Sequence, residues 1–235
     1  MKADLLHTLN VERAARRVAV LITELGTGAQ RLVKADDIAA DALADELDKV
    51  LRSGKSGVLM HEGGELFLQV QVPPVRMIVL GAVHISQALA PLARLSGFDM
   101  TVVDPRTAFA TPERFPDVKV LADWPDVALP QLGGLDRYTA MIAVTHDPKI
   151  DDPGLIAALK ADCFYVGALG SRKTHAKRVE RLQTAGFDET QIARIHAPIG
   201  LDIGAVSPEE IAVSILAELI LALRKKPLRP AAGAP

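Results

Sequence analysis

Apolar and polar residues follow two different rhythms along the chain, and the change falls at Pro73-Pro74. Before these prolines, the apolar run Val18–Leu25 and a Gly63-Gly64 turn between two short apolar segments are typical of an antiparallel sheet. Two helices are predicted beside it from a polar opening segment and an apolar stripe, at Ala3–Arg17 and Asp41–Arg52. Residues 1–74 are therefore expected to form a small α+β domain.

After the prolines, apolar runs of strand length alternate with helical segments. The strands are predicted at Arg76–Gly81, Asp99–Asp104, Val118–Leu121, Tyr138–Thr145 and Cys163–Gly170. The helices are predicted at Ile85–Gly97, Pro153–Ala161, Ser171–Ala185 and from Ser207 onward. This alternation favours an α/β fold, a Rossmann-like parallel sheet covered by helices, over residues 75–226. The proline- and alanine-rich residues 227–235 are expected to be a disordered tail.

Composition and charge exclude several classes of protein. The net charge of -2 gives no general basic field for nucleic acid or an acidic membrane surface. No apolar stretch approaches the roughly 20 residues of a membrane helix, and the N-terminus lacks a secretory signal, so a cytoplasmic location is expected. The single cysteine, Cys163, opens an apolar strand and is expected in the core. No histidine spacing suits a metal site.

The first candidate site is the turn that follows the first strand of the α/β domain. A dinucleotide-binding turn has three glycines, G-x-G-x-x-G, and only Gly81 fits, because Val83 and Ser86 stand at the other two positions. His84 lies in this turn. Asp104 ends the next strand at about the offset where an acidic side chain accepts a ribose hydroxyl. The turn is either a ligand site or a plain connection, and Asp104 is either a ligand or a cap.

The second candidate is Thr145-His146-Asp147, which follows another apolar strand. Ligands of open α/β sheets bind beyond the carboxyl ends of the strands, so His146 and Asp147 are placed for hydrogen bonding or proton transfer. The alternative is that Asp147 begins a turn and His146 covers its surface.

The third candidate is the start of a basic helix. The strand that contains Gly167 ends at Gly170, and Ser171, Arg172 and Lys173 then open a helix with four lysines and arginines in its first turns. Cations oppose the dipole at a helix N-terminus, so their presence favours a bound phosphate or another anion. The alternative is a solvated basic face.

The fourth candidate is the apolar loop before the last helix, in which Gly200 and Gly204 bracket Asp202. An apolar loop has to satisfy its backbone groups internally. It forms either the wall of a pocket or a docking surface for the last helix.

Together these segments resemble the C-terminal domain of the XdhC/CoxI family, the maturation factors of xanthine dehydrogenase and related molybdenum hydroxylases. The resemblance covers roughly Val75 to Leu223 and is carried by THD, GALGSRKTH, GLDIG and TVVDPRTAFATPERFP. It implies a Rossmann-type domain that binds molybdenum cofactor, protects it and hands it to an apo-enzyme. It also implies contact with a cysteine desulfurase and a homodimer. The phosphate of the cofactor would give the basic helix start an anion to bind.

On this resemblance we predict a non-catalytic chaperone that assists sulfuration and insertion of molybdenum cofactor into a molybdenum hydroxylase. The predicted cofactor-binding residues are Gly81, His84, Asp104, Thr145, His146, Asp147, Gly167, Gly170, Ser171, Arg172, Lys173, Gly200, Asp202 and Gly204. Two alternatives stay open. One is an NAD(P)-dependent oxidoreductase that uses His146 or His84 as acid or base, and the other is a scaffold that binds only the partner enzyme.

Overall fold

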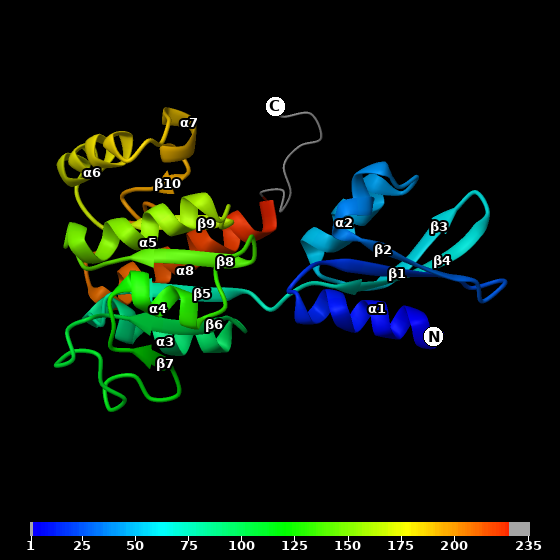
Figure 1. Cartoon of the computed structure of the whole chain (residues 1–235), viewed down its shortest axis with the longest axis horizontal. Helices are drawn as coiled ribbons and strands as arrows, with labels where there is room; N and C mark the ends of the chain where they lie inside the picture. The colour runs from blue at the N-terminus through cyan, green and yellow to red at the C-terminus, as the bar shows by residue number, and fades with distance from the viewer. Residues whose placement is uncertain (1, 226–235) are drawn as a thin grey trace. The chain divides into compact units, whose positions relative to one another are not determined.

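The computed structural model describes residues 2–225, which form two compact units that divide the chain between Pro73 and Pro74 (Figure 1). The expected tail at 227–235 lies outside the described residues. The predicted fold class is confirmed, because a small α+β unit precedes a parallel sheet with helices on both faces. Among residues 2–225, no helix combines the length and the apolar character needed to span a bilayer.

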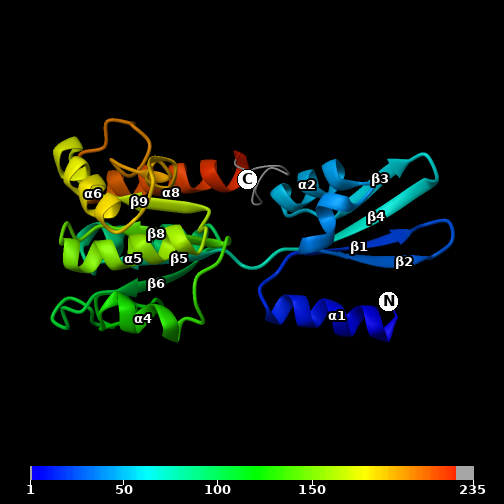
Figure 2. The same ribbon diagram turned by 45° about the horizontal axis from the view of Figure 1, so that its top comes forward.

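The first unit is an antiparallel sheet of four strands in the order β2-β1-β4-β3. Its elements are α1 (Ala3–Ala14), β1 (Ala19–Glu24), β2 (Gln30–Lys34), the 3-10 helix η1 (Ala35–Ala40), α2 (Ala44–Ser53), β3 (Gly57–His61) and β4 (Gly64–Gln71). The central strand β1 is buried on both faces, which explains its continuous apolar run. Val20 and Ile22 pack with Leu47 and Leu51 of α2, and α1 lies on the other side of the sheet (Figure 2).

The second unit holds a six-stranded parallel sheet in the order β10-β9-β8-β5-β6-β7. Its strands are β5 (Arg76–Leu80), β6 (Asp99–Val103), β7 (Lys119–Leu121), β8 (Thr139–Ala143), β9 (Tyr165–Ala168) and β10 (Ile195–His196). The chain moves outward from β5 through β6 to β7 and then returns to β8 on the other side of β5. This is the doubly wound order, and its switch point lies between β5 and β8.

Helices cover both faces of this sheet. They are α3 (His84–Leu95), α4 (Pro125–Gln131), α5 (Pro148–Lys160), α6 (Arg172–Thr184), α7 (Glu189–Ile192) and α8 (Pro208–Lys225). Side chains of β5 alternate between the faces: Met77 and Val79 pack with α3 and α8, whereas Ile78 and Leu80 pack with α4 and α5.

The predicted start of α5 at Pro153 is wrong by more than one turn, since the helix begins at Pro148. Asp147 is its N-cap and accepts a hydrogen bond from the backbone N–H of Lys149 at 2.9 Å. Pro148 fits the first helical position, where no N–H is needed, and Pro153 is tolerated further inside. The helix therefore includes Asp151, which lies outside the predicted helix Pro153–Ala161.

Candidate functional site

The central strands of the parallel sheet end level with one another. Leu80 of β5 pairs with Val103 of β6 and with Ala143 of β8, and Ala143 pairs in turn with Ala168 of β9. The four segments that follow these strands therefore leave from the same edge of the sheet. Three of the predicted site segments follow these strands, and the fourth follows the parallel strand β10, so all four leave from the carboxyl ends of strands, where ligands of such sheets bind.

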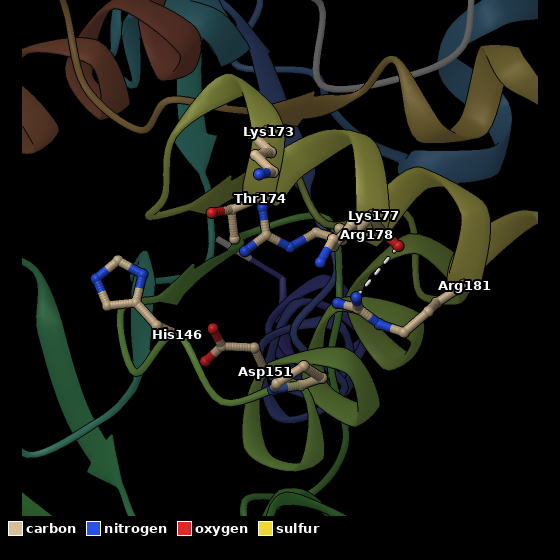
Figure 3. Close-up of a pocket in the computed structure, with 8 residues that line it drawn as sticks. His146, Asp151, Lys173, Thr174, Lys177, Arg178 and Arg181 are labelled. Atoms are coloured by element: carbon tan, nitrogen blue, oxygen red, sulfur yellow. Dashed lines mark hydrogen bonds between the residues drawn. The ribbon is translucent and has the colours of Figure 1, made fainter.

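A pocket of about 290 Å³ lies at this edge between α6 and the start of α5 (Figure 3). Its lining residues are His146, Pro148, Asp151, Lys173, Thr174, Lys177, Arg178 and Arg181. Two of them, His146 and Lys173, were predicted from the sequence. Lys177 and Arg181 follow Lys173 at four-residue steps, and this spacing was visible in the sequence as one face of a helix.

The turn after β8 presents His146 to the pocket. Thr145 donates its hydroxyl to Asp151 Oδ1 at 2.6 Å, and it accepts the backbone N–H of Asp147 at 3.0 Å. His146 has a φ of 65°, in the left-handed region that histidine tolerates better than most residues. Thr145 and Asp147 therefore shape the turn, while the side chain of His146 lines the pocket (Figure 3).

Two side chains of opposite charge are buried against this pocket. Arg178 is 2% exposed and Asp151 is 1% exposed. Burial lowers the pKa of Arg178, and burial raises the pKa of Asp151 in spite of the hydrogen bonds from Thr145. Each shift disfavours the charged form of its group, as expected for charges that are moved out of water.

The predicted helix start divides into structural and pocket-lining residues. Ser171 caps α6 by accepting the backbone N–H of Thr174 at 3.2 Å. Gly170 has a φ of +134°, and a Cβ there would lie 3.0 Å from Thr174 Cγ2. Lys173 lines the pocket, whereas the exposed Arg172 is not among its lining residues.

The turn after β5 borders a second hollow, of about 450 Å³. Its lining residues are Ala82, Val83, His84, Arg106, Ala108, Phe109 and Arg114. Gly81 itself is packed against the neighbouring turn: its φ is +118°, and a Cβ there would lie 2.7 Å from Thr145 Cγ2. Gly81 therefore lets the turns after β5 and β8 come into contact at the switch point.

Asp104 has an exposed fraction of 0% and is hydrogen-bonded to two residues that line this second hollow. Its Oδ2 accepts the backbone N–H of Ala82 at 2.8 Å and Arg106 Nη2 at 2.7 Å. Its Oδ1 accepts the backbone N–H and the Nε of Arg106, each at 2.9 Å. Burial alone would raise the pKa of Asp104, but these hydrogen bonds outweigh burial and lower it. Both carboxylate oxygens are thus used inside the protein.

The glycines near the last helix are packing positions. A Cβ on Gly167 would lie 2.5 Å from Ile199 Cδ1, and a Cβ on Gly200 would lie 2.3 Å from Ser214 Oγ of α8. The backbone N–H of Gly200 also donates to Glu218 Oε2 at 2.9 Å. Asp202 and Gly204 are exposed and belong to neither pocket lining. The loop thus makes the contacts of a docking segment for α8.

Cys163 is buried, with an exposed fraction of 1%, as expected for a core residue. Burial raises the pKa of its thiol to about 12. Within residues 2–225, no three histidine, cysteine or acidic side chains gather in a way that could hold a metal ion.

These features define a class of protein: a doubly wound, Rossmann-type domain with a cationic pocket at the carboxyl edge of its sheet. The model of the XdhC Rossmann domain matches residues 77–219. The chain therefore belongs to the XdhC family, and the resemblance found in its sequence is confirmed.

Curated relatives agree with this membership. The chain is 32% identical over 176 residues to the uncharacterized protein YqeB of Escherichia coli, which covers 73% of the chain. It is 32% identical over 147 residues to the molybdenum cofactor insertion chaperone PaoD of E. coli, which covers 63%. It is 33% identical over 156 residues to a probable xanthine dehydrogenase subunit of Bacillus subtilis, which covers 66%. These matches span 32%, 40% and 45% of the relatives' own lengths.

A solved structure shares the fold. The crystal structure of a xanthine dehydrogenase from Bacillus halodurans matches 98% of this chain and 66% of its own, with a TM-score of 0.65 and 24% sequence identity. At this identity the likeness shows the fold, including both units of the chain.

Proposed function

We propose that the chain binds molybdenum cofactor as its cargo and delivers it to the apo-form of a molybdenum hydroxylase. The observation that carries the proposal is the pocket between α5 and α6, where Lys173, Lys177 and Arg178 gather at the edge of the sheet that ordinarily binds ligands. The cofactor carries a phosphate, which is the anion such a pocket suits. The name of the relative PaoD and the family membership support the same cargo.

Binding of NAD(P) is less compatible with the geometry. A dinucleotide site needs an acidic side chain that is open to the ribose, but both oxygens of Asp104 are engaged by Ala82 and Arg106. Val83, in place of the second fingerprint glycine, adds a side chain where a pyrophosphate would have to approach the backbone.

We also propose that sulfuration of the cargo uses sulfur from another protein. Cys163 is the single cysteine of the chain, and its buried thiol with a raised pKa is a poor nucleophile. The chain would then present the cofactor to a cysteine desulfurase and afterwards to the recipient enzyme, in the cytoplasm and as a homodimer.

A binding titration tests the cargo. Purified protein is titrated without oxygen with molybdenum cofactor and, in parallel, with NAD(P)H, and the loaded protein is then mixed with an apo-molybdenum hydroxylase. Saturable cofactor binding and gain of hydroxylase activity are expected. Lys173→Ala should weaken binding roughly two- to fivefold through the loss of one exposed charge. Lys160→Ala is the matched control, since this exposed cation at the last residue of α5 does not line the pocket.

Other outcomes would contradict the proposal. Binding of NAD(P)H in place of the cofactor would favour the oxidoreductase. Binding of neither ligand, together with capture of the apo-enzyme, would favour the scaffold.

A further inference from the structure

The most unusual group in the pocket is the guanidinium of Arg178. Its Nη2 donates to the backbone oxygen of Leu169 at 3.0 Å. Its Nε and Nη1 are buried and have no hydrogen-bond partner among the described residues. Figure 3 shows the side chain reaching from α6 toward the side of the pocket where Asp151 and His146 lie.

Asp151 lines the same pocket, and it too has a buried polar atom without a hydrogen-bond partner among the described residues. Its Oδ1 accepts the hydroxyl of Thr145 at 2.6 Å, but its Oδ2 is buried without a partner in the part of the chain that the structure describes. The charges of Asp151 and Arg178 are close enough to influence each other, yet no hydrogen bond joins them. Asp151 and Arg178 therefore do not form a salt bridge in which each group provides the hydrogen bonds of the other.

An arrangement of this kind destabilises the empty protein. Burying a charged group without full hydrogen bonding costs free energy, and an apolar side chain of similar size would usually be as stable or more so. Buried donors that lack partners and line a pocket are characteristic of a binding site, where the ligand supplies the missing acceptors.

The charge around Arg178 indicates the sign of the ligand. Lys173 and Lys177 lie on the same face of α6, at steps of four residues, and both line the pocket. Arg181 is already paired with Asp152, with Nη2 and Oδ1 3.0 Å apart. Three cations therefore face one buried carboxyl, and an anion is the ligand that balances them.

The first turn of α6 offers fewer free backbone N–H donors to a bound anion than its sequence suggests. The backbone N–H of Thr174, which would point toward a bound anion, is capped by Ser171. Buried side-chain donors without a partner lie deeper along the helix, on the guanidinium of Arg178. The anion is therefore expected beside Arg178, a residue that the sequence-based prediction did not include.

We propose that Arg178 anchors a phosphate-monoester subsite in this pocket, with its Nε and Nη1 donating to phosphate oxygens and with Lys173 and Lys177 adding charge. This subsite rests on the proposed function for the identity of its cargo, since the cofactor supplies the phosphate. A guanidinium suits the task because its planar donors match two phosphate oxygens at once.

Titrations with paired ligands test the subsite. The full chain is titrated with a stable oxidised pterin derivative of the cofactor, with and without its phosphate group, and with inorganic phosphate. Arg178→Met should weaken binding of the phosphorylated pterin roughly ten- to hundredfold, the loss expected for hydrogen bonds to a charged group. The same variant should leave binding of the dephosphorylated pterin unchanged. Lys160→Met, which changes an exposed cation at the last residue of α5 and outside the pocket lining, is the matched control and should bind like the unchanged protein.

A second variant tests the subsite even if Arg178→Met does not fold. Lys177→Ala changes an exposed side chain of the same pocket and should also weaken binding of the phosphorylated pterin alone. The subsite is refuted if Arg178→Met binds the phosphorylated pterin normally, or if it loses both pterins equally.

The subsite and the cargo can fail separately. If inorganic phosphate binds in a manner that depends on Arg178 while neither pterin binds, the subsite stands and the cargo is wrong. If both pterins bind with equal affinity and without dependence on Arg178, the cargo stands and the subsite is wrong.

Discussion

Two aspartate–arginine pairs lie at the carboxyl edge of the same sheet and differ in how fully they are satisfied. Asp104 and Arg106 are joined by two side-chain hydrogen bonds, and the backbone N–H of Ala82 donates to the same carboxylate. Asp151 and Arg178 are both buried, whereas Arg106 is partly exposed, and three polar atoms of Asp151 and Arg178 have no partner within residues 2–225.

This difference separates a structural pair from a binding pair. Asp104 and Arg106 hold the turn after β5 in place, and their charges are compensated in the empty protein. Asp151 and Arg178 leave hydrogen-bonding capacity unused, which is expected of groups that are completed by a ligand. Each pair can be disrupted by its own substitution. The resulting changes in the free energy of unfolding and in its dependence on pH should differ between the two pairs in size and sign.

The largest effect on stability is expected from Arg106→Met. This change removes both side-chain hydrogen bonds to Asp104, which is fully buried, and leaves only backbone donors for its charge. We expect a loss of about 3 kcal/mol in the free energy of unfolding, at the lower end for a broken buried pair because Arg106 is partly exposed. Urea denaturation measures this quantity.

An exposed ion pair provides the matched control. Arg94 and Asp117 lie 3.0 Å apart with side chains that are 69% and 73% exposed. Arg94→Met should cost less than about 1 kcal/mol. An Arg106→Met variant no less stable than Arg94→Met would show that Asp104 does not depend on its partner.

The next largest loss of stability is expected from Gly81→Ala, which changes the contact between the turn after β5 and the turn after β8. The new Cβ would be held at a positive φ and would lie 2.7 Å from Thr145 Cγ2, so Thr145 has to move. We expect a loss of about 2 kcal/mol from backbone strain and overpacking together. Because Thr145 is the side-chain partner of Asp151, binding in the α5–α6 pocket should weaken as well. Gly204→Ala, at a positive φ with no atom near its Cβ, isolates the strain alone.

A smaller change in the free energy of unfolding is expected from Arg178→Met. Arg178→Met removes one hydrogen bond to Leu169 together with a buried charge that has two unpartnered donors among the described residues, and we expect the free energy of unfolding to change by about 1 kcal/mol or less. Phosphate-bearing ligand should stabilise the unchanged protein and not this variant. A loss in the empty protein as large as that of Arg106→Met would mean that Arg178 is already satisfied, and the comparison between the pairs would fail.

The sequence predicted the α/β fold well because its strands are buried on both faces and read as unbroken apolar runs, as in β5 and β8. It also predicted the edge of the sheet where His146 and Lys173 line a pocket. These features depend on local pattern and on the rule that parallel strands end together.

The deeper part of the site depends on tertiary contacts that no local pattern contains. Arg178 resembles the other cations of α6 in the sequence, and only the packing of α6 beside α5 shows that it is buried. Asp151 was missed because the start of α5 was placed at Pro153. The sequence likewise could not show that Arg106 turns back to occupy both oxygens of Asp104.

The last prediction compares the pH dependence of the two pairs. Burial raises the pKa of Asp151 above its unfolded value, so the stability it contributes is complete below the unfolded pKa and is lost as pH rises through the folded pKa. The hydrogen bonds from Arg106 and Ala82 outweigh burial and lower the pKa of Asp104, so its contribution is present above the unfolded pKa and is lost as pH falls through the folded pKa.

Asp151→Asn and Asp104→Asn should therefore differ from the unchanged protein with opposite dependence on pH. Relative to the unchanged protein, Asp151→Asn should gain stability as pH rises from about 4, the ordinary range of an aspartate. Asp104→Asn should instead approach the stability of the unchanged protein as pH falls below about 4. Urea denaturation of the three proteins across this range measures both differences. Slopes of the same sign would show that Arg178 stabilises the charge of Asp151 as Arg106 does that of Asp104, and the α5–α6 pocket would then hold a closed ion pair in place of an open anion site.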